Sequence, residues 1–271
     1  MSGVIDVDAD WLALREAEDA RARSRELALA AASALAPGQV VVHDLGSGTG
    51  SMLRWLGPLL PGPQVWVLHD WNAALLDRAL IGDPARDRDG RPISVQIRTR
   101  ELARLRRADL DGADLVTASA LLDVLTAEEI GAVVEACTAA GCPVLISLSV
   151  TGDVELDPVE PLDDELRAAF NAHQQRLVGG RRLVGPSGAA LAEGLFREAG
   201  WSVARATSLW RLGRREPGLL GRWLDGWLDA ALEQRADLRR DGVRYRALRE
   251  AQLRRGALSA TVSHADLLAS P

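Results

Sequence analysis

The chain has 271 residues, a formal net charge of −6 and 47% hydrophobic residues, which is enough apolar material for one large core. All 32 basic residues are arginine, so lysine chemistry such as a Schiff base is excluded. No apolar run approaches the ~20 residues that a membrane-spanning helix needs, and the first residues are charged rather than signal-like. We therefore expect a cytoplasmic protein with no membrane association, folded as a single domain over residues 1–271.

The two cysteines, Cys137 and Cys142, have no further cysteine or histidine at metal-ligand spacing. Because a disulfide would conflict with a cytoplasmic protein, we predict two reduced, part-buried thiols and no metal site. The arginines are unevenly distributed, since residues 205–255 contain 13 arginines against 7 acidic residues. This segment is either a solvated helical surface or a patch for an anionic substrate.

Residues 1–37 are predicted as an N-terminal helical segment, because Trp11, Leu14 and Ala17 recur at helical spacing. Strands and helices then alternate. The strands are predicted at residues 39–45, 64–70, 93–99, 113–119 and 143–150, and the helices between them at 51–60, 72–80 and 126–140. This alternation indicates an α/β fold with a parallel, doubly wound sheet.

The alternation is interrupted after residue 150. The later elements are predicted as a loop at 151–162, helices at 163–177 and 187–199, a strand at 201–208, helices at 218–235 and 241–254, and a strand at 257–264. They leave two helical insertions, a lid-like one at residues 151–185 and a second at 209–256, before and after the sixth strand.

A glycine-rich loop follows the first predicted strand in the sequence Asp-Leu-Gly-Ser-Gly-Thr-Gly, residues 44–50. The glycines allow a sharp turn and a close approach of the backbone to a ligand. Their spacing is GxGxG, whereas the dinucleotide fingerprint GxGxxG would require a glycine where Ser51 stands. With Asp44 two residues before the first glycine, the segment resembles motif I of class I S-adenosylmethionine-dependent methyltransferases.

The resemblance implies S-adenosylmethionine as the cofactor and a seven-stranded Rossmann-like methyltransferase sheet whose last strand is antiparallel. It assigns the cofactor's amino-acid part to the loop residues Asp44, Gly46, Ser47, Gly48 and Gly50.

Asp70 ends the second predicted strand, 24 residues after Gly46. A carboxylate there can accept hydrogen bonds from both ribose hydroxyls, and the class I family uses an acidic residue at this place. Capping of the next helix is a compatible alternative. The neighbouring Trp71 is placed to pack on adenine or to be a core residue.

Related methyltransferases often follow their third strand with an acidic residue that binds the adenine amino group. Glu101, followed by Leu102, is our choice here, against a solvated surface carboxylate. After the fourth strand, Ser119 and Asp123 are candidates for lining the site, although Asp123 can equally be a local cap. No Asn/Asp-Pro-Pro-aromatic sequence occurs, which weakens a nucleic-acid amine as the acceptor.

The helix predicted at residues 163–177 carries His173 on an apolar face with Leu166 and Phe170. A histidine on such a face is usually a core residue. The alternative is a lid helix from which His173, with Asn171, reaches the acceptor and serves as the catalytic base.

Further aromatic and basic residues leave alternatives open. Trp223 and Trp227, with Trp210 before them, form either core or the wall of an acceptor pocket, and His264 is expected to make a structural hydrogen bond. The cofactor carboxylate can be bound by an arginine of the N-terminal segment, but the sequence does not choose among Arg15, Arg21 and Arg23.

The interpretation is S-adenosylmethionine-dependent methyl transfer to an O or N nucleophile of a small molecule, either anionic or apolar and aromatic. The alternatives are an RNA methyltransferase that uses the arginine-rich segment and a non-catalytic cofactor-binding module. The acidic composition argues against nucleic acid, and the glycine spacing argues against an NAD-dependent dehydrogenase. We expect a monomer or a homodimer.

Overall fold

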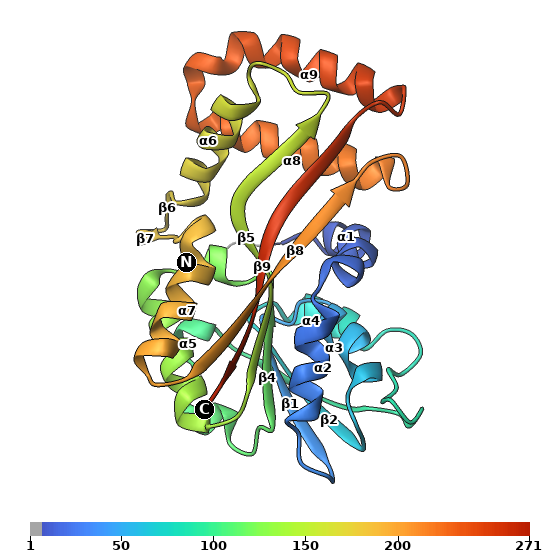
Figure 1. Cartoon of the computed structure of the whole chain (residues 1–271), viewed down its shortest axis with the longest axis vertical. Helices are drawn as coiled ribbons and strands as arrows, with labels where there is room; N and C mark the ends of the chain where they lie inside the picture. The colour runs from blue at the N-terminus through green and yellow to red at the C-terminus, as the bar shows by residue number, and fades with distance from the viewer. Residues whose placement is uncertain (1–6) are drawn as a thin grey trace.

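The computed structural model describes residues 7–271, and it has a seven-stranded sheet as its centre (Figure 1). The strand order is β3-β2-β1-β4-β5-β9-β8. The strands are β1 (Val40–Leu45), β2 (Gln64–Asp70), β3 (Ser94–Thr99), β4 (Leu115–Ser119), β5 (Val144–Asp157), β8 (Ser202–Leu212) and β9 (Ser259–Ser270). Only β9 runs antiparallel to its neighbours β5 and β8. The predicted seven-stranded, doubly wound sheet is confirmed.

Helices cover both faces of this sheet. They are α1 (Ala9–Ala22), α2 (Arg25–Ser33), α3 (Ser51–Leu56), α4 (Ala73–Ala79), α5 (Ala127–Ala140), α6 (Asp163–Gln174), α7 (Gly188–Glu198), α8 (Pro217–Gln234) and α9 (Arg239–Arg254). Successive strand residues face opposite layers, so Leu115 packs in the cluster with α2 and α3 while Val116 packs in the cluster with α5 and α7. This two-sided burial explains the continuous apolar runs of the central strands.

The predicted loop at residues 151–162 is wrong over its first half, because β5 continues to Asp157. Val154 and Leu156 are buried there, whereas Asp153, Glu155 and Asp157 are exposed. This alternation is the period-two pattern of a half-buried strand. Acidic residues are depleted in strands, so the composition of this segment favoured a loop. Strands β8 and β9 are also longer than predicted, at Ser202–Leu212 and Ser259–Ser270.

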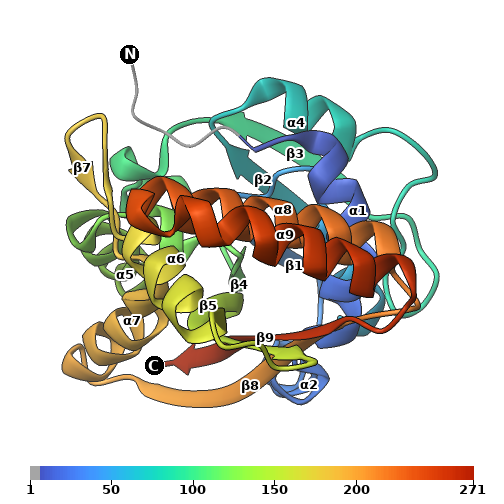
Figure 2. The same cartoon turned by 90° about the horizontal axis from the view of Figure 1, so that it is seen from above.

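The long ends of β5, β9 and β8 project beyond the rest of the sheet and are covered by α6, α8 and α9 (Figures 1 and 2). Trp210, Leu220 and Trp227 are buried in the cluster that joins them. Trp227 is 1% exposed and stacks on Trp223 with 5.7 Å between ring centroids. The packing therefore supports a core role for Trp210, Trp223 and Trp227 rather than a role in an acceptor pocket.

The lid-like insertion contains α6 and a small hairpin. Helix α6 ends at Gln174, three residues earlier than predicted. The glycine turn at residues 179–180 joins β6 (Leu177–Val178) to β7 (Arg181–Arg182). Arg181 of this hairpin pairs with Glu129 at the start of α5, with 2.5 Å between Nη2 and Oε2. The insertion is thereby connected to the edge of the sheet where β4 ends.

Thr126 caps α5 through a capping box, in which its hydroxyl accepts from the Glu129 N–H at 3.1 Å and its own N–H donates to Glu129 Oε2 at 2.8 Å. Thr126→Ala is expected to lower the free energy of unfolding by about 1 kcal/mol, because it leaves a helix N–H without its acceptor. Urea denaturation checks this. Thr138→Ala, at a half-buried position in the last turn of the same helix, is the control and is expected to change stability by less than ~0.5 kcal/mol.

Cys137 and Cys142 are both free thiols, and they are buried rather than part-buried as predicted. Burial raises the pKa of both, that of Cys142 to about 11. Within residues 7–271, no helix is long and apolar enough to cross a bilayer, and no group of histidine, cysteine and acidic side chains is arranged to hold a metal ion.

Several arginines of the arginine-rich segment are paired with neighbouring carboxylates. Arg246 pairs with Asp225 and Asp229, and Arg205 pairs with Glu193. Arg249 is fully buried and pairs with Asp163. These contacts support the solvated-surface interpretation of residues 205–255 over an anion-binding patch.

Candidate functional site

The glycine loop between β1 and α3 adopts a conformation that depends on its glycines. Gly46 and Gly48 have φ angles of +64° and +52°, in the left-handed region where other residues are strained. A Cβ on Gly46 would lie 2.8 Å from a methyl carbon of Leu121. The loop therefore presents bare backbone at the carboxyl ends of the strands, where ligands bind in doubly wound sheets.

Asp70 fastens this loop to the neighbouring strand. Its Oδ2 accepts from the Gly48 N–H at 2.8 Å, and its Oδ1 accepts from the Asn72 N–H at 2.9 Å. Burial raises its pKa, and these backbone hydrogen bonds oppose the shift. The Trp71 N–H also acts on this carboxylate. A carboxylate has about four lone-pair positions, so Asp70 keeps acceptor capacity for at least one further hydroxyl. Asn72, rather than Asp70, caps α4.

Asp44 lies beneath the loop and is almost fully buried, at 1% exposure. Its Oδ1 accepts from the Thr117 hydroxyl at 2.7 Å, whereas its Oδ2 has no partner within the described residues. Burial raises the pKa of Asp44 to about 7. A buried carboxylate oxygen without a donor is costly in an isolated protein, so this atom is suited to a cationic group of a ligand.

Arg23, at the end of α1, is the basic counterpart of Asp44. Its Nη2 donates to Ser51 Oγ at 2.9 Å and to Ser119 Oγ at 3.1 Å. Because a guanidinium can only donate, both hydroxyls act as acceptors toward it and keep their own protons for another partner. Nε and Nη1 of Arg23 are buried and have no acceptor in the part of the chain that the structure describes.

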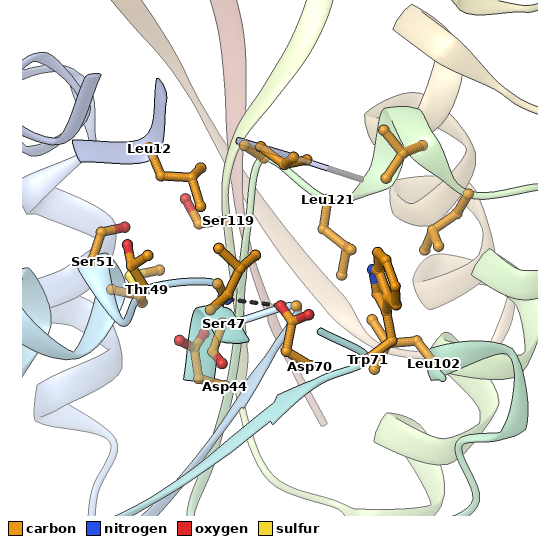
Figure 3. A pocket seen from close by; sticks show the side chains of 18 of the residues that line it. Leu12, Asp44, Ser47, Thr49, Ser51, Asp70, Trp71, Leu102, Ser119 and Leu121 are labelled. Carbon is orange, nitrogen blue, oxygen red and sulfur yellow. Dashed lines mark hydrogen bonds between the residues drawn. The ribbon is translucent and has the colours of Figure 1, made fainter. Parts of the chain in front are cut away.

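A cavity of about 570 Å³ opens over the loop (Figure 3). Thr49 and Ser51 lie on one side of it, and Trp71 and Leu102 lie on the other, with Asp70 between them. Of the predicted cofactor residues, only Gly50 does not line it. The others do: Asp44, Gly46, Ser47, Gly48, Asp70, Trp71, Glu101, Leu102 and Ser119. The structure thus brings together residues from four strand ends.

Helix α1 and the segment after β4 close the cavity on the side away from the sheet. Leu12, Arg15 and Asp19 of α1 line it, as do Leu121 and its neighbours. Ala120, between β4 and that segment, has a φ of +50°, which is uncommon for a residue with a Cβ. Backbone held in a sparsely populated region is frequent at ligand sites. At the far end, the Glu129–Arg181 pair forms the rim.

His173, the predicted base, does not line the cavity. It is buried on α6, with its Nε2 3.3 Å from Glu233 and its Nδ1 3.2 Å from Arg176. Asn171 of the same helix donates to the Gly152 carbonyl at 2.9 Å. His173 is therefore not placed to contact an acceptor in this cavity. Its contacts agree with the alternative that it is a structural residue of α6.

Other candidates also lie outside the cavity lining. Burial raises the pKa of Asp123 to about 6, and His264 is buried with its ring centroid 5.5 Å from that of Trp210. Arg21 faces away and pairs with Glu18 and Glu216.

Sequence reasoning missed Ser51 and Thr117 and left the choice of arginine open. Ser51 was considered only as the residue that replaces a dinucleotide-type glycine, although a hydroxyl at the first turn of a helix after such a loop faces the ligand. Thr117 is a polar residue within a buried strand, which is a usable signal because buried hydroxyls need partners. Arg23 gave no such signal, because its burial depends on the fold.

No protein-family model and no curated protein sequence matches the chain. Among solved structures, a cyclopropane-fatty-acyl-phospholipid synthase-like protein from Lactobacillus casei is 15% identical, with a TM-score of 0.50 over 98% of this chain and 94% of its own. A cyclopropane synthase from Mycobacterium tuberculosis is 13% identical, with a TM-score of 0.46 over 90% of this chain and 82% of its own. An O-methyltransferase family protein from Burkholderia thailandensis is 24% identical, with a TM-score of 0.42 over 62% and 47%. The strand order and the first of these similarities show the Rossmann-like fold of class I methyltransferases.

Proposed function

We propose that the chain is an S-adenosylmethionine-dependent methyltransferase that acts on an O or N nucleophile of a small molecule. The observation that carries the proposal is the pair of opposite charges left beside the glycine loop. Asp44 offers an unpartnered carboxylate oxygen, and Arg23 polarises the hydroxyls of Ser51 and Ser119. These groups match the ammonium and carboxylate of an amino acid.

The remaining lining fits the other parts of the cofactor. Asp70 has remaining acceptor capacity for a ribose hydroxyl, and Trp71 and Leu102 provide apolar surfaces for adenine at the same end of the cavity. Glu101 lies beside them and is assigned to the adenine amino group. The bare backbone at Gly46 and Gly48 leaves room for the ligand to contact the loop directly.

Bound S-adenosylmethionine supplies an electrophilic methyl group on a sulfonium. The chain's own residues then have to align the nucleophile and exclude water. Leu12, Leu121 and Leu125 line the cavity with apolar side chains that can do so. Orientation of this kind can lower a barrier by several kcal/mol, up to roughly 7–11 in ideal cases. We assign no general base, and a carboxylate acceptor would not require one.

The rival functions have weaker support. The dinucleotide fingerprint of NAD-dependent dehydrogenases requires a third glycine, and this chain has Ser51 at that position. An RNA methyltransferase would need an exposed basic surface, but many arginines of residues 205–255 are already paired with carboxylates. A non-catalytic module would bind the cofactor without transferring its methyl group to any acceptor.

Asp70→Ala tests the ribose assignment. The variant is expected to bind S-adenosylhomocysteine at least tenfold more weakly, because each charge-assisted hydrogen bond contributes about 1.5–3 kcal/mol. Isothermal titration calorimetry measures the affinity, and circular dichroism checks the fold. Asp77→Ala, an exposed carboxylate on α4, is the matched control and should bind like the wild type. Unchanged affinity in Asp70→Ala would reject the assignment.

A further inference from the structure

Arg15 is a cavity residue that the cofactor assignment leaves without a role. It lies on α1, lines the cavity and has a side chain only 13% exposed. Long charged side chains are rarely buried to this extent unless they are paired. The question is which part of its guanidinium is paired and which part faces the cavity.

Two contacts hold this guanidinium in one orientation. Its Nε donates to Asp19 Oδ2 at 2.9 Å, and its carbon lies 4.8 Å from the centroid of the Trp210 ring. The other oxygen of Asp19 accepts from Trp210 Nε1 at 3.0 Å. Arg15, Asp19 and Trp210 therefore form a locked unit, in which each group fixes the position of the next.

The outer edge of Arg15, formed by Nη1 and Nη2, has no protein acceptor among the described residues. Both oxygens of Asp19 are already engaged by other donors. A guanidinium whose Nε edge and one face are occupied offers these two parallel N–H donors, which is the geometry that binds a carboxylate in a bidentate manner. The edge is preorganised, so little side-chain entropy would be lost on binding.

The proposed function assigns the cofactor's own carboxylate to Ser51 and Ser119, which Arg23 holds. Arg23 serves Ser51 and Ser119 on the side of the cavity toward α3. Arg15 lies on the helix that carries Leu12, which Figure 3 shows beside Ser119, and it also lines the cavity. The cavity lining also contains the apolar side chains of Leu121, Val124 and Leu125.

We propose that the outer edge of Arg15 binds a carboxylate of the methyl acceptor, and that the acceptors are small carboxylic acids with an apolar body. The inference deepens the proposed function and depends on it, because the acceptor space is defined only when the cofactor occupies the glycine-loop side. Arg15 is then a specificity-determining residue, since a neutral analogue would leave its two donors unpaired.

The test uses the full-length protein saturated with S-adenosylhomocysteine. The probes are 4-fluorobenzoate and its neutral counterpart 4-fluorobenzamide, whose binding is followed through the fluorine NMR signal of each. Wild-type protein is expected to bind the benzoate at least tenfold more tightly than the amide. Arg15→Met is expected to abolish this preference. The variant should bind S-adenosylhomocysteine with an affinity within about twofold of the wild type, which is well below a tenfold change.

Two further variants separate the role of Arg15 from a general effect on α1. Arg15→Gln keeps a donor for Asp19 and should also lose the preference, which guards against a folding defect in Arg15→Met. Arg21→Met removes an arginine of the same helix that pairs with Glu18 and Glu216, and it should retain the preference.

Three results would overturn the proposal: no preference for the benzoate in the wild type, a preference that survives in both Arg15 variants, or a large loss of S-adenosylhomocysteine affinity in them. The last result would assign Arg15 to the cofactor. Wild-type protein that binds no S-adenosylhomocysteine at all would reject the proposed function itself, and the acceptor assignment with it.

Discussion

Arg23→Met is expected to weaken S-adenosylhomocysteine binding by roughly thirtyfold, or about 2 kcal/mol, which is the usual contribution of hydrogen bonds to a charged group. The substitution removes the buried positive charge and the donors that hold Ser51 and Ser119 as acceptors. Their hydroxyl protons would then no longer be directed to the carboxylate of the ligand. Calorimetric titration measures the change.

Two controls make the result specific. Arg21→Met, two residues away and largely exposed, should bind S-adenosylhomocysteine like the wild type. 5′-Methylthioadenosine, which lacks the amino-acid part, should bind Arg23→Met and wild type equally. Equal loss of affinity for both ligands would indicate a disturbed fold and would contradict a carboxylate-specific role for Arg23.

Asp266→Ala is expected to lower the free energy of unfolding by about 3–5 kcal/mol, because one buried and one part-buried N–H donor would lose their acceptor. The Asp266 carboxylate is 0% exposed and accepts from Leu148 N–H and Ser24 N–H, both at 2.7 Å. Leu148 has a φ of +56° at an irregularity in β5, so this contact also holds an unfavourable backbone conformation. Urea denaturation measures the effect.

Asp266 also connects the central sheet to the site, since Ser24 follows Arg23 directly. Asp153→Ala, an exposed carboxylate on β5, is the control and should change stability by less than ~0.5 kcal/mol. A destabilisation below ~1 kcal/mol in Asp266→Ala would show that the two backbone donors find other acceptors.

The elements that the sequence predicts well are those with one dominant signal. β2 was predicted at residues 64–70, where the structure has it, because an apolar run ends at a polar site residue. The glycine loop and Asp70 were also predicted, since their backbone requirements and strand-end positions are local. Such local patterns are sufficient to predict the fold class and the part of the cavity that is formed by the glycine loop and Asp70.

The parts that escaped prediction depend on tertiary contacts. The extension of β5 past Val150 is stabilised by its pairing with β9 and by the helices α6 and α8, which pack with Val154 and Leu156. Our proposal of Arg23 over Arg15 and Arg21 rests on which side chain the fold buries beside Ser51 and Ser119. His173 lies on the apolar face of a helix, as predicted, but this face packs on α8, where the histidine contacts Glu233.

Calorimetric titration of the wild-type protein with S-adenosylhomocysteine, alongside an identical titration with NAD⁺, tests the central claim most directly. The cavity over the glycine loop predicts one-to-one binding of S-adenosylhomocysteine and no binding of NAD⁺. Heat from NAD⁺ alone, or none from S-adenosylhomocysteine even at millimolar concentration, would contradict it.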